Sequence, residues 1–373
     1  MSPWDFDGSS RVLVLVPHPD DETLATAGLL QKAGAAGATV RVVFLTDGEN
    51  NPWPQRLMER RWRIGQAERA RWGRLRRREA LAALGTLGVS RDDVVFLGLA
   101  DQTLTEILLD THRDAVTRLS EIIRRWRPSL LVSPSPRDLH PDHSAAAVLV
   151  HFALARLSRE TPSFARVEYL VHTRPSRKRG PHALLLPLSS EQRARKRRAI
   201  LCHASQLPLR PRSLLARARS TEAFLAAPQR PSLSCEDHPV RKAVVRDGRL
   251  QLELVMRPGP GAFGRVTLYF VASNHGQDAA KLFTSLPDGR RFPRNRHRVV
   301  SLRDLATNSV VLTGQYRGDR RRGRLWLPHR TFARMDRVFV KLERRWGFFD
   351  EAGWRELPLR ISPSLSGRGA GGG

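Results

Sequence analysis

Short apolar runs alternate with longer amphipathic segments along the first part of the chain. Residues 12–16 form an uninterrupted apolar run, mostly β-branched, and residues 40–45 form a second run of this kind. Such runs are typical of strands that are buried on both faces of a parallel sheet. Residues 20–37 between them have apolar positions at helical spacing and end in small residues, as expected of a crossover helix.

The same alternation continues to about residue 202. It predicts further strands at residues 94–97, 130–132 and 164–172, and helices at residues 76–87, 111–126, 144–157 and 190–202. An alternation of strands and helices predicts an α/β fold with a mostly parallel sheet and flanking helices. Residues 207–239 are rich in Pro, Ser and Arg. We interpret them as the connection between two domains, with one short helix at residues 214–227.

From residue 240 the pattern changes to short strand-like runs separated by turn residues. The runs lie at residues 240–245, 250–256, 266–271, 299–302, 309–312, 325–327 and 338–342. Several short strands at near-regular spacing predict an antiparallel, sandwich-like or barrel-like domain. We therefore expect an α/β domain at residues 1–230, a β-rich accessory domain at residues 231–361 and a disordered tail of small residues at 362–373.

Composition excludes some classes of protein. Apolar residues make up 40% of the chain, enough to bury a core, but no stretch of about 20 apolar residues is present, so we expect no membrane span. The N-terminus lacks the apolar core of a secretory signal. Cys202 and Cys235 are the two cysteines of the sequence, so no disulfide framework is implied. These features predict a cytoplasmic protein.

The chain is strongly basic. It has 64 Lys and Arg against 36 Asp and Glu, a formal net charge of +28. A charge of this sign favours anionic partners such as nucleic acid, an acidic membrane surface or a phosphorylated substrate. An arginine-rich composition spread over a solvated surface explains the charge equally well, so we leave its function open.

The first candidate chemical motif is Pro-His-Pro-Asp-Asp-Glu at residues 17–22. It directly follows the first predicted strand, because proline removes a backbone donor and ends the run. Ligands of open α/β sheets bind beyond the carboxyl ends of the strands. An imidazole and three carboxylates on a loop stiffened by prolines are well suited to hold a metal ion.

A second motif, His-Pro-Asp-His at residues 140–143, also follows a predicted strand. Together the two motifs offer three histidines and four acidic groups. A catalytic zinc typically takes three protein ligands and leaves one position open. The two motifs therefore suffice for a three-ligand metal site with a general base and a general acid.

The pairing of these two motifs resembles the LmbE-like (PIG-L) family of zinc-dependent de-N-acetylases. The resemblance covers roughly the first 210 residues. It includes four more short matches, at residues 45–49, 76–79, 97–101 and 205–206. It implies a Rossmann-like α/β domain and hydrolysis of the acetamide of N-acetylglucosamine conjugates, or of related amides.

The resemblance also implies a metal site and a base. His18, Asp21 and His143 would bind the metal, which we expect to be Zn²⁺, although Fe²⁺ and other divalent ions suit the same ligands. Asp20 would be the general base that activates the attacking water. The substrate would be an amino-sugar conjugate, which the basic surface suggests is anionic or lipid-linked.

The remaining roles carried over from the family concern the leaving group and the sugar. His140 would be the general acid that protonates the leaving amine, with Asp142 orienting or charging it, and Arg76 and Asp101 would contact the sugar. One position departs from some members, which have a tyrosine where this chain has Asp138. Stabilisation of the oxyanion would then fall to the metal, His140 or another donor.

A basic segment at residues 55–78 has ten arginines with interleaved Trp62 and Trp72. It suits a substrate flap or a peripheral membrane contact, a solvated helix, or a nucleic-acid surface. We consider nucleic acid the least favoured. In the β-rich part, Trp326, Trp346 and Trp354 suit either a core or glycan binding.

Two alternatives to N-acetylglucosamine deacetylation stay open. One is hydrolysis of a different amide, such as a thiol conjugate or an acylated antibiotic amino sugar. The other is a basic glycan- or nucleic-acid-binding protein on a deacetylase fold. Against the second alternative, every ligand and acid–base position expected from the family is intact.

Overall fold

The computed structural model describes residues 3–157, 164–174, 183–228, 231–256, 266–275, 277–286, 297–319, 321–344 and 348–359. The chain divides into two compact units. The first comprises the residues up to 228 together with Phe348–Gly353, and the second comprises the other residues from 229 onwards. The expected division into residues 1–230 and 231–361 does not include this return of the chain to the first unit. The expected tail at residues 362–373 lies outside the described residues.

In the first unit, seven strands among the described residues form one sheet in the order β3-β2-β1-β4-β5-β7-β6. Their bounds are β1 Arg11–Val16, β2 Thr39–Thr46, β3 Val94–Leu99, β4 Leu130–Pro134, β5 Ala165–Tyr169, β6 Ala183–Pro187 and β7 Thr221–Ala226. Strands β3, β2, β1, β4 and β5 are parallel, and β7 is antiparallel to both its neighbours. The predicted mostly parallel α/β sheet is confirmed.

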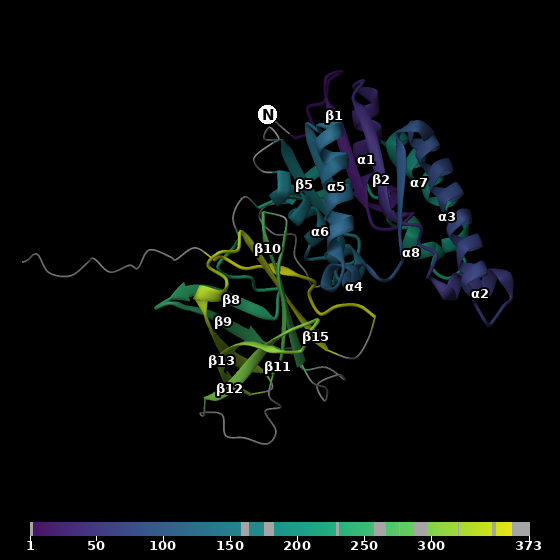
Figure 1. Cartoon of the computed structure of the whole chain (residues 1–373). Helices are drawn as coiled ribbons and strands as arrows, with labels where there is room; N and C mark the ends of the chain where they lie inside the picture. The colour runs from purple at the N-terminus through teal and green to yellow at the C-terminus, as the bar shows by residue number, and fades with distance from the viewer. Residues whose placement is uncertain are drawn as a thin grey trace, which may run out of the picture. The chain divides into compact units, whose positions relative to one another are not determined.

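Helices cover both faces of this sheet (Figure 1). Their bounds are α1 Asp21–Ala35, α2 Pro52–Glu59, α3 Gln66–Leu87, α4 Leu104–Leu109, α5 His112–Trp126, α6 Pro141–Leu157, α7 Ser190–Cys202 and α8 Pro211–Leu215. Helices α1, α3 and α7 pack against one another, and α4, α5 and α6 form a second group. The strand order reverses direction between β1 and β4, and such a switch point opens a crevice at the carboxyl ends of the strands.

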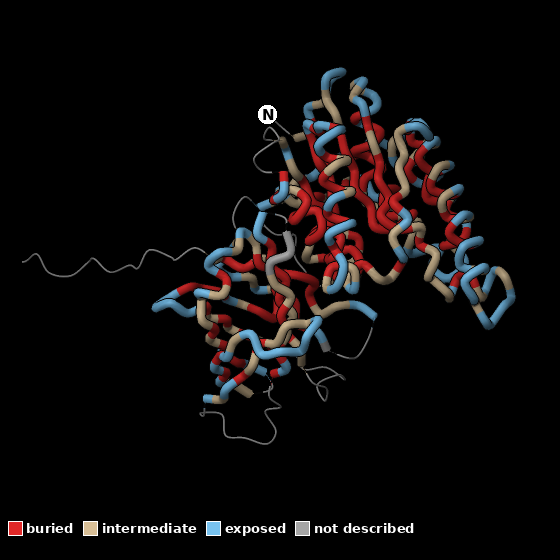
Figure 2. Tube along the Cα trace, viewed as in Figure 1, coloured by how far each residue is buried: buried red, intermediate tan, exposed pale blue. Residues whose placement is uncertain are grey.

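The apolar runs found in the sequence form the core of this unit. Val12, Val14 and Val16 on β1 have no exposed surface, and they pack with Val42 and Phe44 of the neighbouring β2. Figure 2 shows the buried residues concentrated along the central strands and the inner helix faces. A rigid sheet therefore supports the loops that leave β1 and β4.

One prediction for the connection between the two domains, residues 207–239, is wrong. The segment predicted as a helix at residues 214–227 instead contains the end of the short helix α8 and the strand β7. Strand β7 lies between β5 and β6 and is held by pairing on both sides, for example Val167 with Ala226. Helical spacing of its few apolar residues is outweighed by this long-range pairing.

The second unit is antiparallel throughout, as predicted. Its nine described strands form one sheet in the order β16-β15-β10-β11-β12-β13-β14-β9-β8. They are β8 Val240–Arg246, β9 Arg249–Val255, β10 Val266–Asn274, β11 Gln277–Leu286, β12 Arg298–Asp304, β13 Val310–Gly318, β14 Arg322–Pro328, β15 Arg337–Arg344 and β16 Arg355–Glu356. Alternate side chains such as Leu250, Leu252 and Leu254 build its core.

Among the described residues, no helix is both long enough and apolar enough to cross a membrane.

Candidate metal centre

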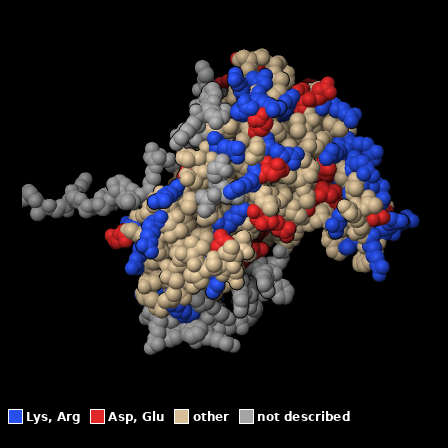
Figure 3. Space-filling model, viewed as in Figure 1, with Lys and Arg blue, Asp and Glu red and all other residues tan. Residues whose placement is uncertain are grey.

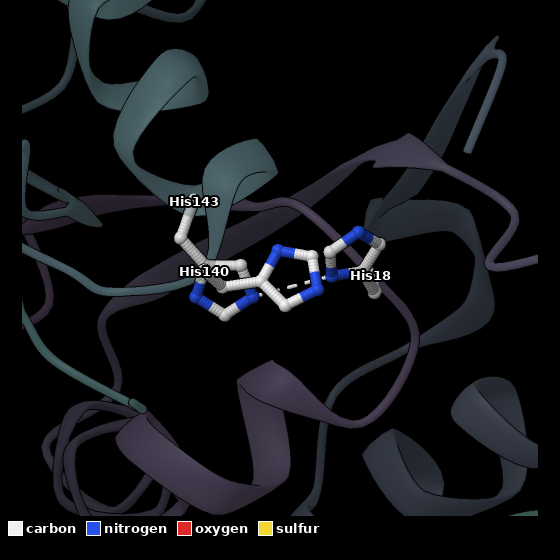
Figure 4. Close-up of side chains that lie close together, drawn as sticks. All are labelled: His18, His140 and His143. Carbon is white, nitrogen blue, oxygen red and sulfur yellow. Dashed lines mark hydrogen bonds between the residues drawn. The ribbon is translucent and has the colours of Figure 1, made fainter. Parts of the chain in front are cut away.

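The two predicted motifs meet at the switch point of the sheet. Strands β1 and β4 are parallel neighbours, with Val14 paired to Val132, so the loops that follow them leave the same edge. His18 lies on the first loop, and His143 lies in the first turn of α6 after the second loop. Figure 4 shows the imidazoles of His18, His140 and His143 gathered at this point.

Three polar atoms form a closed triangle there. His18 Nδ1 lies 3.2 Å from His143 Nε2 and 3.3 Å from Asp21 Oδ2, and His143 Nε2 lies 3.1 Å from the same oxygen. All three side chains are buried. The structure thus brings together the three residues that we predicted as metal ligands.

The triangle has the size that a small divalent cation requires. A tetrahedral ion with bonds of about 2.1 Å holds neighbouring ligands about 3.4 Å apart. The three edges of 3.1–3.3 Å are close to this value. Two imidazoles and a carboxylate suit zinc, iron, manganese or cobalt. The residues present therefore fit a divalent metal ion.

Other groupings of potential ligands overlap with this triangle. Within the described residues they are His18 with His140 and His143, Asp21 with His143 and His172, and His18 with Asp101 and Asp142. They share His18 or His143 with the triangle, so all of them belong to one centre.

Carboxylates hold the far side of the His18 ring. His18 Nε2 lies 3.1 Å from Asp101 Oδ1 and 3.2 Å from Asp142 Oδ2. Partners of this kind fix the tautomer and the orientation of a ligating histidine, and here they direct Nδ1 toward the triangle. We expected Asp142 to orient His140, but its carboxylate contacts His18 instead.

Asp138 places a carboxylate beside the ring of His143 in a similar way. Its Oδ2 lies 3.4 Å from His143 Nδ1 and accepts hydrogen bonds from the backbone N–H groups of Val171 and His172. The side chain of Asp138 is fully buried. The residue at which the sequence departs from some family members thus orients a predicted metal ligand and ties it to the end of β5.

The surrounding charges favour a positive charge at the triangle. Burial lowers the pKa of His18, but Asp101, Asp142 and Asp21 raise it well above its usual value. For His143, Asp21 and Asp138 overcome burial and raise the pKa to about 9. In turn, His143 and His18 overcome the effect of burial on Asp21 and hold its pKa well below the usual range. A bound cation would satisfy the same carboxylates.

Asp20, the predicted base, sits beside the triangle in an unusual backbone conformation. Its φ is 126°, which is rare for a residue other than glycine and costs about 1–3 kcal/mol. Glu22 Oε2 accepts a hydrogen bond from the Asp20 N–H, and Arg76 Nη2 lies 3.4 Å from Asp20 Oδ2. Burial raises the pKa of Asp20 to about 7, although Arg76 opposes the shift. That value suits a general base.

The two residues expected to contact the sugar are both buried. The Arg76 guanidinium donates hydrogen bonds to the carbonyl oxygens of Gly48 and Pro19 and so supports the Asp20 loop. Asp101 accepts a hydrogen bond from the backbone N–H of Asn50 in addition to its contact with His18. Their contact with a sugar stays a prediction, and their contacts within the chain support the centre.

His140, the predicted acid, lies beside the two histidines of the triangle. Its ring centre lies 4.8 Å from that of His18 and 4.7 Å from that of His143. The backbone N–H of Asp142 donates to His140 Nδ1, so the proton of the neutral ring is on Nε2. Burial lowers the pKa of His140 well below its usual value, and positive charge on His143 and His18 lowers it further.

Three aromatic rings beside His140 were missed or given little weight in the sequence. His172 lies 5.3 Å from His140 and 5.0 Å from His143 between ring centres. Phe348 lies 4.9 Å from His140, and Phe349 lies 5.2 Å from His172. The sequence gives no signal for the phenylalanines, because they follow the predicted motifs by about two hundred residues.

The fold and the centre together define a class of protein, a mostly parallel α/β sheet with flanking helices and a candidate His–Asp–His metal site at its carboxyl edge. A model of the PIG-L family, described as GlcNAc-PI de-N-acetylase, matches residues 13–154. The chain therefore carries a PIG-L family domain, and the resemblance noted from the two motifs is confirmed.

Relatives of known name match part of the chain. A 1D-myo-inositol 2-acetamido-2-deoxy-alpha-D-glucopyranoside deacetylase of Mycobacterium avium is 34% identical over 146 residues, which are 36% of this chain and 47% of that protein. A probable N-acetyl-alpha-D-glucosaminyl L-malate deacetylase 2 of Bacillus subtilis is 34% identical over 40% of this chain and 63% of that protein. The chain thus spans about half to two thirds of the length of these relatives.

A solved structure of N,N'-diacetylchitobiose deacetylase from Pyrococcus horikoshii aligns with a TM-score of 0.45 and 22% identity. The alignment covers 59% of this chain and 84% of that one. A similarity of this size supports no statement about activity.

Proposed function

We propose that the chain is a metal-dependent hydrolase that removes the N-acetyl group from an N-acetylglucosamine-containing conjugate. The observation that carries the proposal is the buried His18–Asp21–His143 triangle, with Asp20 next to Asp21 in the chain and the His140 ring beside His18 and His143. The matching relatives, which are named as deacetylases of such conjugates, support the substrate class. Zinc is the metal we favour.

The proposed reaction divides the work among these side chains. A divalent ion bound by the triangle would polarise the amide carbonyl and lower the pKa of water. Asp20 accepts a proton from the attacking water, which adds to the carbonyl carbon. As negative charge develops on the carbonyl oxygen, His140 takes up a proton, and as the C–N bond breaks the imidazolium supplies its Nε2 proton to the nitrogen, because an amine leaves readily only when protonated. The proton that the nitrogen gains balances the one that Asp20 removed from the water. The products are acetate and a free amino sugar.

Neutral His140 serves a second purpose in this scheme. The Nε2–H that results from the Asp142 contact is a hydrogen-bond donor before it is an acid. Such a donor stabilises negative charge that develops on the carbonyl oxygen. This would supply the stabilisation that a tyrosine provides at the position of Asp138 in some family members.

The experiment that tests the function measures acetate and free amine released from N-acetylglucosamine and from its inositol, malate, phosphate and nucleotide conjugates. We expect wild-type activity on at least one conjugate. Asp20→Asn should retain the metal and lose at least a hundredfold in rate, since general-base catalysis contributes 10²–10⁴-fold. Asp114→Asn, an exposed change on α5, serves as the matched control and should leave the rate unchanged.

A specific observation favours one alternative substrate class. Phe348 and Phe349, whose side chains are 48% and 45% exposed, place apolar surface next to His140. An apolar wall beside the reacting amide would favour an acyl group longer than acetyl, as in an acylated amino sugar. A series of acyl chains from acetyl to decanoyl decides between them. A rate that rises with chain length in the wild type and falls in Phe348→Ala/Phe349→Ala would support the alternative.

A further inference from the structure

Four large apolar side chains are exposed together on the α2 hairpin, by which we mean residues 52–74. The exposed fractions are 60% for Trp53, 53% for Leu57, 45% for Met58 and 76% for Trp62. Trp53 and Leu57 are four residues apart on α2 and so share one face of the helix. Exposed apolar patches rimmed by polar residues mark interaction surfaces, whereas single exposed apolar side chains do not. The hairpin thus presents an apolar surface to the outside.

The same hairpin is strongly cationic. Its 23 residues include seven arginines and two glutamates, a net charge of 7 − 2 = +5. The glutamates are paired, Glu59 with Arg71 at 2.6 Å and Glu68 with Arg61 at 2.7 Å. Other arginines of the hairpin are exposed and have no carboxylate partner in the part of the chain that is described: Arg60, Arg63, Arg69 and Arg74. Figure 3 shows Lys and Arg gathered at this end of the first unit.

The apolar and cationic groups are held on one structured surface. The Arg56 guanidinium lies 5.0 Å from the Trp53 ring centre and 5.2 Å from the Trp62 ring centre, and its Nε donates to the Trp62 carbonyl. The buried side chain of Gln55 donates to the carbonyl of Glu68 and so joins α2 to α3. Both indoles therefore contact the same guanidinium, Trp53 from α2 and Trp62 from the loop between α2 and α3.

We propose that the α2 hairpin is a docking surface for an anionic lipid bilayer. Exposed Trp, Leu and Met side chains enter the headgroup and acyl boundary, and surrounding arginines bind acidic headgroups. Tryptophan also favours the membrane interface because its ring is apolar and its N–H is polar. Leu57 and Met58 argue against nucleic acid, which would be recognised by the arginines and indoles but gains nothing from aliphatic side chains.

This docking surface adjoins the candidate metal centre within the first unit. Helix α2 begins at Pro52, directly after the loop in which the Asn50 N–H donates to Asp101 Oδ2 over 2.8 Å. Asp101 is in turn the carboxylate that contacts His18. A bilayer bound at α2 would therefore bring the centre close to the lipid surface. The proposal concerns binding and does not depend on the proposed hydrolysis.

Co-sedimentation of the full chain with lipid vesicles tests the proposal. Vesicles of phosphatidylcholine with phosphatidylserine should bind the protein, vesicles of phosphatidylcholine alone should bind it weakly, and salt at about 1 M should weaken the binding by screening. Lipids with brominated acyl chains should quench tryptophan fluorescence in the wild type. Absence of sedimentation with either vesicle would overturn the proposal.

Two double variants separate the apolar and the charged parts of the surface. Trp53→Ala/Trp62→Ala should reduce vesicle binding at least tenfold and reduce the quenching by brominated lipid. Arg60→Gln/Arg63→Gln should reduce binding by roughly twenty-five-fold, since each arginine near an anionic surface contributes about fivefold. Both changes are on exposed residues, and circular dichroism melting should confirm that both variants fold.

The matched control removes two charges elsewhere on the first unit. Arg193→Gln/Arg197→Gln alters exposed arginines of α7 and should leave vesicle binding nearly unchanged. If this control weakened binding as much as Arg60→Gln/Arg63→Gln, the effect would come from overall charge and the docking surface would be refuted. Tighter binding to duplex RNA or DNA than to vesicles, with no effect of Trp53→Ala/Trp62→Ala on vesicle binding, would refute it in favour of nucleic acid.

Discussion

Asp142 contacts two histidines through different parts of the same residue. It lies in the first turn of α6, where backbone N–H groups have no partner within the helix, and its own N–H donates to His140 Nδ1. Its carboxylate accepts from the backbone N–H groups of Gln102 and Leu104 and faces His18 Nε2. The side chain therefore supports the metal ligand and the backbone sets the tautomer of the predicted acid.

This arrangement predicts the effect of Asp142→Asn. An amide holds the His18 ring less firmly and makes it less basic, so the affinity for Zn²⁺ should fall by about 10–100-fold. The rate at saturating metal should change much less, because the N–H that contacts His140 is retained. Competition with a chelating indicator measures the affinity. An unchanged affinity together with a large loss of rate would instead support the role that we first expected for this carboxylate.

His203 offers a test of pH dependence at a residue that is not itself a predicted metal ligand. It is buried, its Nε2 lies 3.0 Å from Glu22 Oε1, and this carboxylate outweighs burial and raises the pKa of His203 above its ordinary 6.5. A raised pKa in the folded state stabilises the fold below pH 6.5, and this contribution is lost as the pH rises through the folded pKa.

We therefore expect His203→Gln to lower the melting temperature of the first unit most at about pH 6. The difference from the wild type should shrink as the pH rises from 6.5 through the raised pKa of the folded protein, above which the histidine is neutral in both the folded and the unfolded state. Melting curves of both proteins across this range, recorded in the presence of chelator, measure the effect. A difference that grows with pH would contradict the assigned direction of the pKa shift.

At the scale of elements, the sequence predicts the parts of the fold that are built from local pattern. Strands β1, β2 and β4 match their apolar runs because buried parallel strands need no polar face. Strand β7 was not predicted, and a helix was only one of the alternatives left open for residues 55–78, within which α3 begins at Gln66. The strand depends on partners far along the chain, and the exposed first half of α3 carries arginines in place of an apolar stripe.

A buried ion pair joins α7, α1 and β7. Lys196 Nζ lies 2.7 Å from Glu222 Oε1 and donates to the carbonyl of Leu24, and Glu222 accepts from the N–H groups of Gly28 and Leu29. Periodicity cannot predict such a pair, since a lysine within the basic stretch of α7 resembles its solvated neighbours. The pair holds α1 and α7 against β7, which lies within the segment predicted to connect the two domains.

Lys196→Met should destabilise the first unit by about 3–5 kcal/mol, because it leaves the charge of Glu222 buried without compensation. Chemical denaturation followed by circular dichroism measures the change in unfolding free energy. Arg197→Met, which alters the exposed neighbour on the same helix, is the control and should have little effect. A loss below about 1 kcal/mol in Lys196→Met would show that Glu222 is solvated or protonated.

At the scale of the whole molecule, the metal-ligand triangle could be predicted from the sequence, whereas the aromatic side chains beside His140 could not. The triangle comes from two motifs that follow adjacent strands, so their meeting follows from the sheet order. Phe348 and Phe349 join the first unit from the far end of the chain, and the Asp350 N–H donates to the carbonyl of Leu139 beside His140. No pattern in the neighbouring sequence indicates that a segment so far along the chain belongs to the first unit.

The net charge of +28 is also easier to interpret once the fold is known. Composition alone did not distinguish a general arginine bias from a binding surface. The structure places exposed apolar side chains among the unpaired arginines of the α2 hairpin, whereas the carboxylates gather around His18 and His143. The positive charge of the α2 hairpin suits the anionic surface that we propose it binds, and the carboxylates around His18 and His143 suit the metal cation that we propose for the centre.

The measurement that tests the account most directly is acetate release as a function of bound metal. The chain is stripped with a chelator, reloaded with increasing Zn²⁺, and assayed with the best conjugate while metal content is determined on the same samples. The account predicts a rate that rises in proportion to bound metal, saturates near one ion per chain, and is absent in His143→Ala. Full activity in the stripped protein, or in His143→Ala, would contradict it.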